Sequence, residues 1–128
     1  MTVAQKHARR PVYDPQPLVE LFGDAPDVIA AVLQTFSTSM ADHVMQLQAA
    51  RATSDAAQLL ALSHRIKGAA HMSGACALAQ AAEQLERAAR RTGGAADLIA
   101  NALAVDRQWV RLRQDARFLA ARDGRRSL

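Results

Sequence analysis

One short segment of the chain brings three chemically distinctive residues onto a single helix face. His64, Lys67 and Gly68 occur in the run ALSHRIKGAAHMSGA, residues 61–75. Residues three and four positions apart lie on the same side of an α-helix, at about 100° per residue. A helix over this run therefore shows an imidazole, an ammonium group one turn later, and then a position with no side chain.

Each of these residues has a chemical use. A neutral imidazole carries a free nitrogen lone pair, so an exposed His64 can act as a nucleophile toward phosphorus. Lys67 can neutralise the negative charge of a phosphoryl group held one turn away, and it is one of only two lysines beside fourteen arginines. Gly68 costs about 1 kcal/mol relative to alanine inside a helix. That cost is explained if another protein's backbone must approach closely beside His64.

Each residue also has a plain structural explanation. A surface histidine is usually inert, a lysine three residues later is usually a solvated charge, and a glycine within a helix can let a neighbouring helix pack closely. A metal site made by His64 and His71 is not expected, because seven residues span about 10.5 Å along the axis. His43 and His7 are expected at the surface, and the sequence assigns them no role.

The composition predicts an all-α fold in a single domain. The chain has 128 residues, and its 29 alanines and 14 leucines far outnumber its 11 valines and isoleucines. This balance favours helix over strand, and all four prolines precede residue 27. A single cysteine, Cys76, excludes an internal disulfide and a thiolate zinc site. No glycine-rich phosphate loop is present, which argues against a nucleotide-binding kinase domain.

Apolar periodicity predicts a short helix followed by four long ones. The short helix has Leu18, Leu21 and Phe22 as its apolar side, and Gly23 ends it. Asp24 is expected to cap the first long helix.

Capping residues predict where the long helices begin and end, and apolar residues at helical spacing predict the stripe of each helix that faces the core. The first ends near Arg51, residues 53–55 (Thr-Ser-Asp) supply the cap of the second, and Gly74 ends that helix. In chain order, the four stripes expected to face the core are Val28, Val32, Phe36, Met40, Val44 and Leu47; Leu59, Leu62, Ile66, Ala69 and Ser73; Leu78, Ala81, Ala82, Leu85 and Ala89; and Leu98, Ala102, Val105, Trp109, Leu112, Ala116 and Leu119.

Short links between long helices predict antiparallel neighbours. A turn at residues 92–94 closes the third long helix, and the fourth is expected to run without a break. The predicted architecture is an antiparallel up-down four-helix bundle with a short extra N-terminal helix. Its expected divisions are an extended arm or linker at 1–16, the bundle at 17–121 and a basic tail at 122–128.

The basic charge is concentrated at the C-terminal end. Residues 107–128 carry seven arginines against Asp115 and Asp123, whereas residues 1–106 hold nine basic and ten acidic side chains. Few aromatics accompany the arginines, so nucleic-acid binding is not favoured. No apolar run approaches the roughly 20 residues that span a bilayer, and the basic N-terminus lacks the apolar segment of a secretory signal. We expect a cytoplasmic protein.

The central segment resembles a known family. The run His64-Arg65-Ile66-Lys67-Gly68-Ala69-Ala70, with Gly74 ten positions after the histidine, looks like the signature of histidine-containing phosphotransfer (HPt) domains. Leu78, Leu85 and Glu86 stand where that family's next helix carries its leucines and a Leu-Glu pair. The resemblance extends more loosely over residues 13–115 and is closest to HPt modules of bacterial phosphorelays, such as those at the C-terminus of hybrid sensor kinases. Ser73 departs from it, because the family usually has an aliphatic residue there.

The resemblance implies a carrier in two-component signal transduction. His64 would accept a phosphoryl group from a receiver's aspartyl phosphate and pass it to the aspartate of another response-regulator receiver. Lys67 would neutralise the phosphoryl charge and Gly68 would give clearance for docking. Small residues nearby, including Ala61, Ala69 and Ala70, would form part of the contact patch. It implies no kinase activity and no cofactor of its own, because the receiver supplies Mg²⁺. The implied partners are receiver domains and an upstream hybrid sensor kinase. We expect this chain to be a monomer that contacts neither a membrane nor a nucleic acid.

Two alternatives stay open at this point. The first is an adaptor of the same fold that docks a receiver or kinase without carrying phosphate. The second is a basic helical nucleic-acid binder that uses the arginine-rich C-terminal segment. The roles of His71, His43 and Cys76 and the direction of phosphoryl flow are not encoded in any motif.

Overall fold

The all-α class predicted from composition is confirmed. The computed structural model describes residues 11–91 and 94–125, and within these ranges every regular element is a helix. The helices are α2 (Gln16–Phe22), α3 (Pro26–Ala52), α4 (Ala56–Ser73), α5 (Cys76–Arg90), α6 (Ala95–Gln114) and α7 (Ala116–Arg122). None of them is long and apolar enough to cross a membrane.

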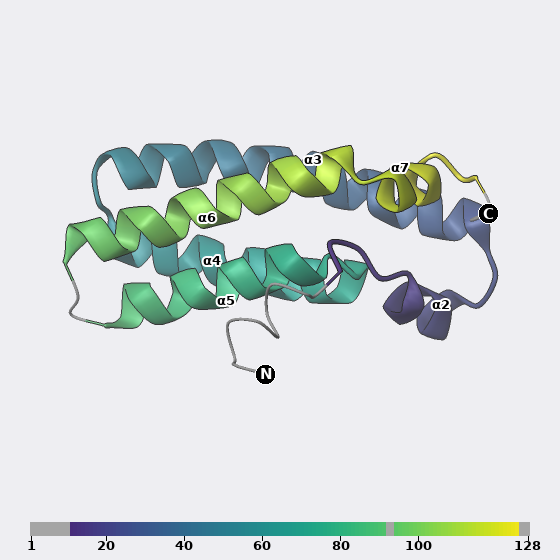
Figure 1. Ribbon diagram of the computed structural model, residues 1–128, viewed down its shortest axis with the longest axis horizontal. Helices are drawn as coiled ribbons and strands as arrows, with labels where there is room; N and C mark the ends of the chain where they lie inside the picture. The colour runs from purple at the N-terminus through teal and green to yellow at the C-terminus, as the bar shows by residue number, and fades with distance from the viewer. Residues whose placement is uncertain (1–10, 92–93, 126–128) are drawn as a thin grey trace.

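The four long helices, α3 to α6, lie side by side along the long axis of the molecule (Figure 1). The short helices α2 and α7 lie together at one end, near the start of α3. Between the long helices runs one continuous apolar core, in which the rings of Phe36 and Trp109 meet edge to face. Its largest fully buried side chains include Leu33, Met40, Leu59, Leu62, Ile66, Leu78, Leu85 and Leu112.

Capping residues set the limits of α4 as the sequence predicts. The Asp55 side chain accepts a hydrogen bond from the Gln58 backbone N–H at 3.1 Å. Gly74 ends the helix in the left-handed conformation, at φ 80°. A Cβ at Gly74 would also overlap the carbonyl oxygen of Asp14, so this position excludes every other residue type. The predicted cap at Asp24 is wrong, because Ala25 occupies the cap position of α3 and makes no side-chain hydrogen bond.

The fourth long helix is interrupted, contrary to the prediction of an unbroken run. Asp115 adopts an extended conformation between α6 and α7, and its carboxylate caps α7 by accepting from the Phe118 N–H at 2.9 Å. The break changes which residues face inward. Phe118 is buried, whereas the predicted Ala116 is exposed and Leu119 is only half-buried. A short polar side chain that competes for backbone N–H groups was the overlooked signal.

Three other parts of the predicted apolar pattern shift. In α2 only Leu18 is buried, and Leu21 and Phe22 are exposed, because only a narrow side of this short helix packs against the core. Val28, at the start of α3, is also exposed. In α4 the buried residue that follows Ile66 on the core side is Ala70, and the predicted Ala69 is only half-buried. The turn expected at residues 92–94 lies partly outside the described residues.

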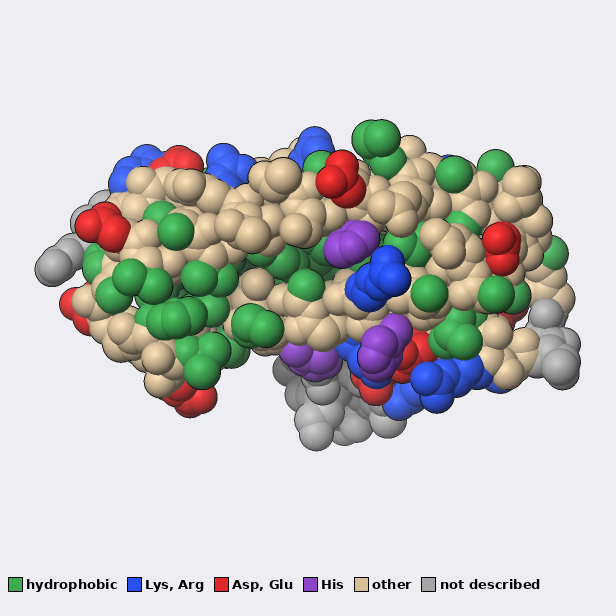
Figure 2. Space-filling model, turned by 180° about the vertical axis from the view of Figure 1, so that it is seen from behind, with side chains coloured by type: hydrophobic (Ala, Val, Ile, Leu, Met, Phe, Trp, Pro, Cys, Tyr) green, Lys and Arg blue, Asp and Glu red, His purple; other side chains and the backbone are tan. Residues whose placement is uncertain are grey.

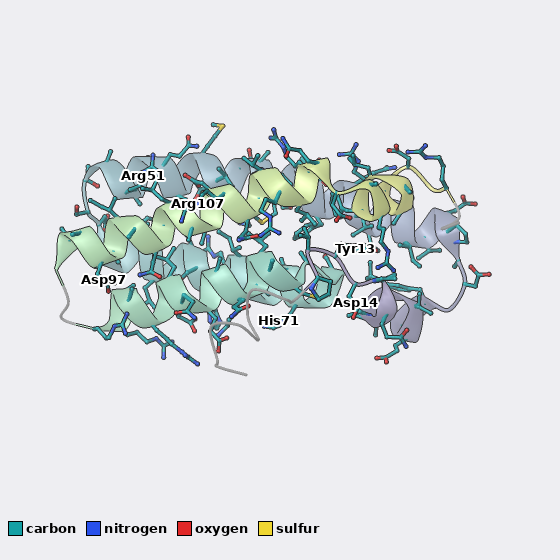
Figure 3. The ribbon with its side chains drawn as sticks, in the orientation of Figure 1. Tyr13, Asp14, Arg51, His71, Asp97 and Arg107 are labelled. Carbon is teal, nitrogen blue, oxygen red and sulfur yellow. The ribbon has the colours of Figure 1, made fainter. Side chains whose placement is uncertain are left out.

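The described end of the predicted arm, residues 11–15, packs against the bundle. Tyr13 is buried, and its ring meets Phe118 edge to face with centroids 5.6 Å apart. The Asp14 N–H donates to the Gly74 carbonyl at 2.8 Å. Figure 3 shows Tyr13 and Asp14 where the chain passes from this arm into α2. The sequence prediction placed no core residue here, because a single tyrosine among prolines has no periodicity.

Replacing Asp55 with alanine should lower the free energy of unfolding by about 1 kcal/mol, because the Gln58 N–H loses its acceptor. Urea denaturation measures this change. The matched control is Asp24→Ala, an aspartate with no cap hydrogen bond, which should stay within about 0.5 kcal/mol of the original chain. Equal losses in the two variants would contradict the assignment of the cap.

Candidate functional site

The segment singled out in the sequence lies in the middle of α4. Leu62, Ile66 and Ala70 turn inward, which leaves His64 and Gly68 exposed on the other side. The His64 side chain is 70% exposed, whereas that of Lys67 is 26% exposed. The structure thus places the three predicted residues together on one accessible strip of helix. Figure 2 shows histidine, basic and acidic side chains grouped on one face of the molecule.

A glutamate from the neighbouring helix joins these residues. Glu86 lies on α5, and its side chain is only 8% exposed. One oxygen, Oε2, lies 2.8 Å from Nδ1 of His64, and the other, Oε1, accepts from Nζ of Lys67 at 2.6 Å. Arg90, one turn further along α5, brings its guanidinium to 3.9 Å from Oε2. Both carboxylate oxygens are therefore occupied by side chains of α4.

The electrostatics of Glu86 favour its charged form. The hydrogen bond from Lys67 is the largest cause of a lowered pKa for this carboxyl, followed by the hydrogen bond with His64. Burial acts in the opposite direction, because it disfavours a charged group, but it is outweighed. Glu86 is thus a carboxylate at neutral pH.

This carboxylate determines which nitrogen of His64 can react. An ionised carboxylate only accepts hydrogen bonds, so Nδ1 must carry the proton that it shares with Glu86. In the neutral ring the lone pair then belongs to Nε2. Among the described residues none forms a hydrogen bond with Nε2. The arrangement therefore presents an oriented nitrogen nucleophile to solvent, with an ammonium group one turn away.

Gly68 does not serve internal packing. A Cβ added at this position would meet no atom within 4 Å outside its own helix turn. The alternative that this glycine lets a neighbouring helix approach closely is therefore wrong. No contact among the described residues accounts for a glycine at this position.

The other residues considered for this site are not joined to it. His71 is exposed on α4, two turns beyond His64 (Figure 3). His43 lies half-buried on α3, and Cys76 lies half-buried at the start of α5. Ala61 is exposed and Ala69 is half-buried beside the site, but Ala70 is buried and cannot contribute to a contact patch. In the described ranges no group of three His, Cys, Asp or Glu side chains is placed to hold a metal ion.

Sequence reasoning overlooked the role of Glu86, although a signal for it exists. Glu86 follows Ala82 by four residues and Leu78 by eight, so it falls on the predicted core-facing stripe of its helix. A carboxylate in that position must find hydrogen-bonding partners, since burying it alone is costly. The apolar periodicity of this helix predicts that Glu86 is buried. It does not predict which side chains of another helix form hydrogen bonds with it.

A comparison with protein-family models gives a match to the Hpt domain over residues 31–117, about two thirds of the chain. The chain belongs to the Hpt domain family. The resemblance noted in the sequence is thereby confirmed. Comparisons with curated proteins and with solved structures gave no match. Membership in the family implies histidine phosphotransfer in a phosphorelay, with receiver domains of response regulators as partners, and a carrier rather than a kinase.

Gly68→Ala should raise the free energy of unfolding by roughly 0.5–1 kcal/mol, because alanine is the better helix former and its Cβ has free space. Thermal and urea unfolding measure the change. Gly74→Ala is the contrasting variant and should be strongly destabilising, since its Cβ would overlap the Asp14 carbonyl. A loss of stability in Gly68→Ala would show that this glycine has an internal role after all.

Glu86→Gln should lose stability relative to the original chain only where Glu86 is ionised. Because the folded-state pKa of this carboxyl is lowered, its stabilising contribution is present above its ordinary value of about 4.5 and is lost as the pH falls below that value. Urea titrations of both proteins between pH 7 and pH 3 should show the stability difference shrinking below pH 4.5. A difference that stays constant across this range would contradict the ion pair with Lys67.

Proposed function

We propose that this chain, with its four long helices as an up-down bundle, carries a phosphoryl group on Nε2 of His64 between two receiver domains. The group would come from an aspartyl phosphate on one response-regulator receiver and go to the aspartate of another. The observation that carries the proposal is the contact between Glu86 and Nδ1 of His64. It supports the proposal because a proton on Nδ1, shared with Glu86, leaves the lone pair on Nε2.

The transfer step follows from that assignment. The Nε2 lone pair forms a bond to phosphorus while the bond between phosphorus and the aspartate oxygen breaks, and the electron pair stays on the carboxylate. The ring becomes a cationic phosphoimidazolium whose Nδ1 proton remains hydrogen-bonded to Glu86. In the second transfer an aspartate oxygen attacks phosphorus, and the N–P electron pair returns to Nε2.

Lys67 and Gly68 would assist in different ways. Lys67 is hydrogen-bonded to Glu86 one turn from His64, so its ammonium group would lie close to the phosphoryl oxygens. Its ammonium has three N–H donors and can keep Glu86 while donating to phosphate. Gly68 presents bare helix backbone beside the reacting nitrogen, which allows the receiver to approach without a side chain between them.

The remaining chemistry belongs to the partners. Phosphoryl transfer from an aspartyl phosphate uses Mg²⁺ held by carboxylates of the receiver. We propose that the chain has no autonomous kinase activity and no cofactor of its own, and that a hybrid sensor kinase lies upstream. We further propose a monomer in the cytoplasm, without nucleic-acid or membrane contact.

The decisive test is the transfer of label from radiolabelled receiver domains to the chain and to His64→Gln. The original chain should acquire an acid-labile, alkali-stable label, and His64→Gln should acquire none. His71→Gln is the matched control, since it removes an exposed imidazole from the same helix and should leave labelling unchanged. Label that persists in His64→Gln would overturn the assignment. Binding of receivers without any labelling of the original chain would instead show a docking adaptor.

A small donor separates the chemistry of the imidazole from docking. Phosphoramidate phosphorylates accessible histidine nitrogens without a protein partner, so it should label His64 in the original chain. Glu86→Gln should be labelled more slowly, by about tenfold, because an amide can donate to Nδ1 as well as accept from it and no longer stabilises the cationic ring. An unchanged rate would remove Glu86 from the mechanism.

A further inference from the structure

A pocket lies at the end of the bundle where α2, α7 and the start of α3 come together (Figure 1). Its volume is about 310 Å³, which falls in the size range of pockets that hold small molecules. Its wall is mostly apolar and includes Val19 of α2, Ile29 of α3 and Ala120 of α7. The proposed function uses none of these residues, because His64 lies in the middle of α4.

The interruption of the fourth long helix helps to form this pocket. Asp115 separates α7 from α6 and caps it, and Arg117 and Ala120 of α7 then line the pocket. The other end of α7 is bonded to α3, because the Gln34 side chain donates to the Arg122 carbonyl at 3.0 Å. Contacts within the chain therefore hold two walls of the pocket in place.

Tyr13 is the buried residue of the lining, and its hydroxyl needs a hydrogen-bond partner. The residue is 2% exposed, and among the described residues no group bonds to this hydroxyl. Burial raises the pKa of Tyr13, so the phenol keeps its proton at neutral pH and can donate it. The guanidinium of Arg117 lowers that pKa, which indicates a positive charge near the hydroxyl. Buried polar groups are normally hydrogen-bonded, so an acceptor is expected here.

The charged side chains of the lining favour an anion at Arg117. Arg117 is exposed, and it forms no ion pair with any residue that the structure describes. The second arginine of the lining, Arg125, is already bonded to Asp123 at 3.3 Å. Asp24 is the one carboxylate of the lining, and it is paired with neither arginine. An arginine can bind a carboxylate through two parallel N–H bonds.

We propose that this pocket binds a small carboxylic acid with an apolar body. The carboxylate contacts the guanidinium of Arg117 and accepts a hydrogen bond from the Tyr13 hydroxyl. The apolar body lies against Val19, Ile29 and Ala120, where its burial from water stabilises the complex. The site does not depend on phosphotransfer, because it shares no residue with the strip around His64.

Calorimetric titration of the full chain with octanoate tests the proposal. Octanoate should bind saturably, whereas octan-1-ol and octylammonium, which have the same chain length, should bind at least about tenfold more weakly. Arg117→Gln should weaken octanoate binding about tenfold, and Tyr13→Phe should weaken it about threefold. Asp24→Asn should not weaken it, because the change removes a negative charge. Tyr13→Phe removes only a hydroxyl without a partner, so its thermal unfolding should match that of the original chain.

The matched control is Arg107→Gln, which removes the same charge from an exposed position on α6 (Figure 3). It should leave the affinity for octanoate within about twofold, since a distant surface charge is screened by salt. No saturable binding to the original chain, or equal losses in Arg107→Gln and Arg117→Gln, would overturn the site. Octylammonium binding as tight as that of octanoate would overturn the choice of a carboxylate. His64→Gln should bind octanoate like the original chain, so failure of this site is distinguishable from failure of phosphotransfer.

Discussion

The carboxylate of Glu86 is the group on which both the fold around α4 and its chemistry depend. It is nearly buried between α4 and α5, and each of its oxygens contacts one polar side chain of α4. A buried carboxylate without partners is costly, and the packing of α4 against α5 brings Glu86 to His64 and Lys67. The same contacts fix the proton on Nδ1. A structural requirement and a chemical one are therefore met by a single side chain.

Under the proposed function, the position of Lys67 would suit both the free and the phosphorylated carrier. In the structure the Lys67 side chain is only 26% exposed, and its ammonium group forms an ion pair with Glu86. A phosphoryl group on Nε2 adds negative charge one turn away, and the three N–H donors allow Lys67 to contact both anions. Arg90, 3.9 Å from Glu86, adds a second positive charge nearby. No large rearrangement is then required on transfer, which suits a carrier that must both accept and release.

Sequence reasoning predicted several local determinants but was wrong about the caps at Asp24 and Asp115, and it did not find contacts between distant segments. Helix composition, the cap at Asp55 and the end at Gly74 follow from neighbouring residues, and they were predicted. The break at Asp115 depends on whether its carboxylate accepts a hydrogen bond from the backbone N–H of Phe118. Apolar periodicity does not reveal that bond. Tyr13 is buried because its ring packs against Phe118 and lies close to Gly74. Both residues are far from Tyr13 in the sequence. The partnership of Glu86 with His64 likewise spans 22 residues and needed the packing of two helices.

The two glycines of this region separate internal from external constraints. Gly74 is required by the molecule itself, since its left-handed backbone and the nearby Asp14 carbonyl exclude a side chain. Gly68 lies in regular helix with free space around it, so within the described chain alanine would be the more stable choice. Under the proposed function, the approach of a receiver domain beside His64 would explain a glycine at this position.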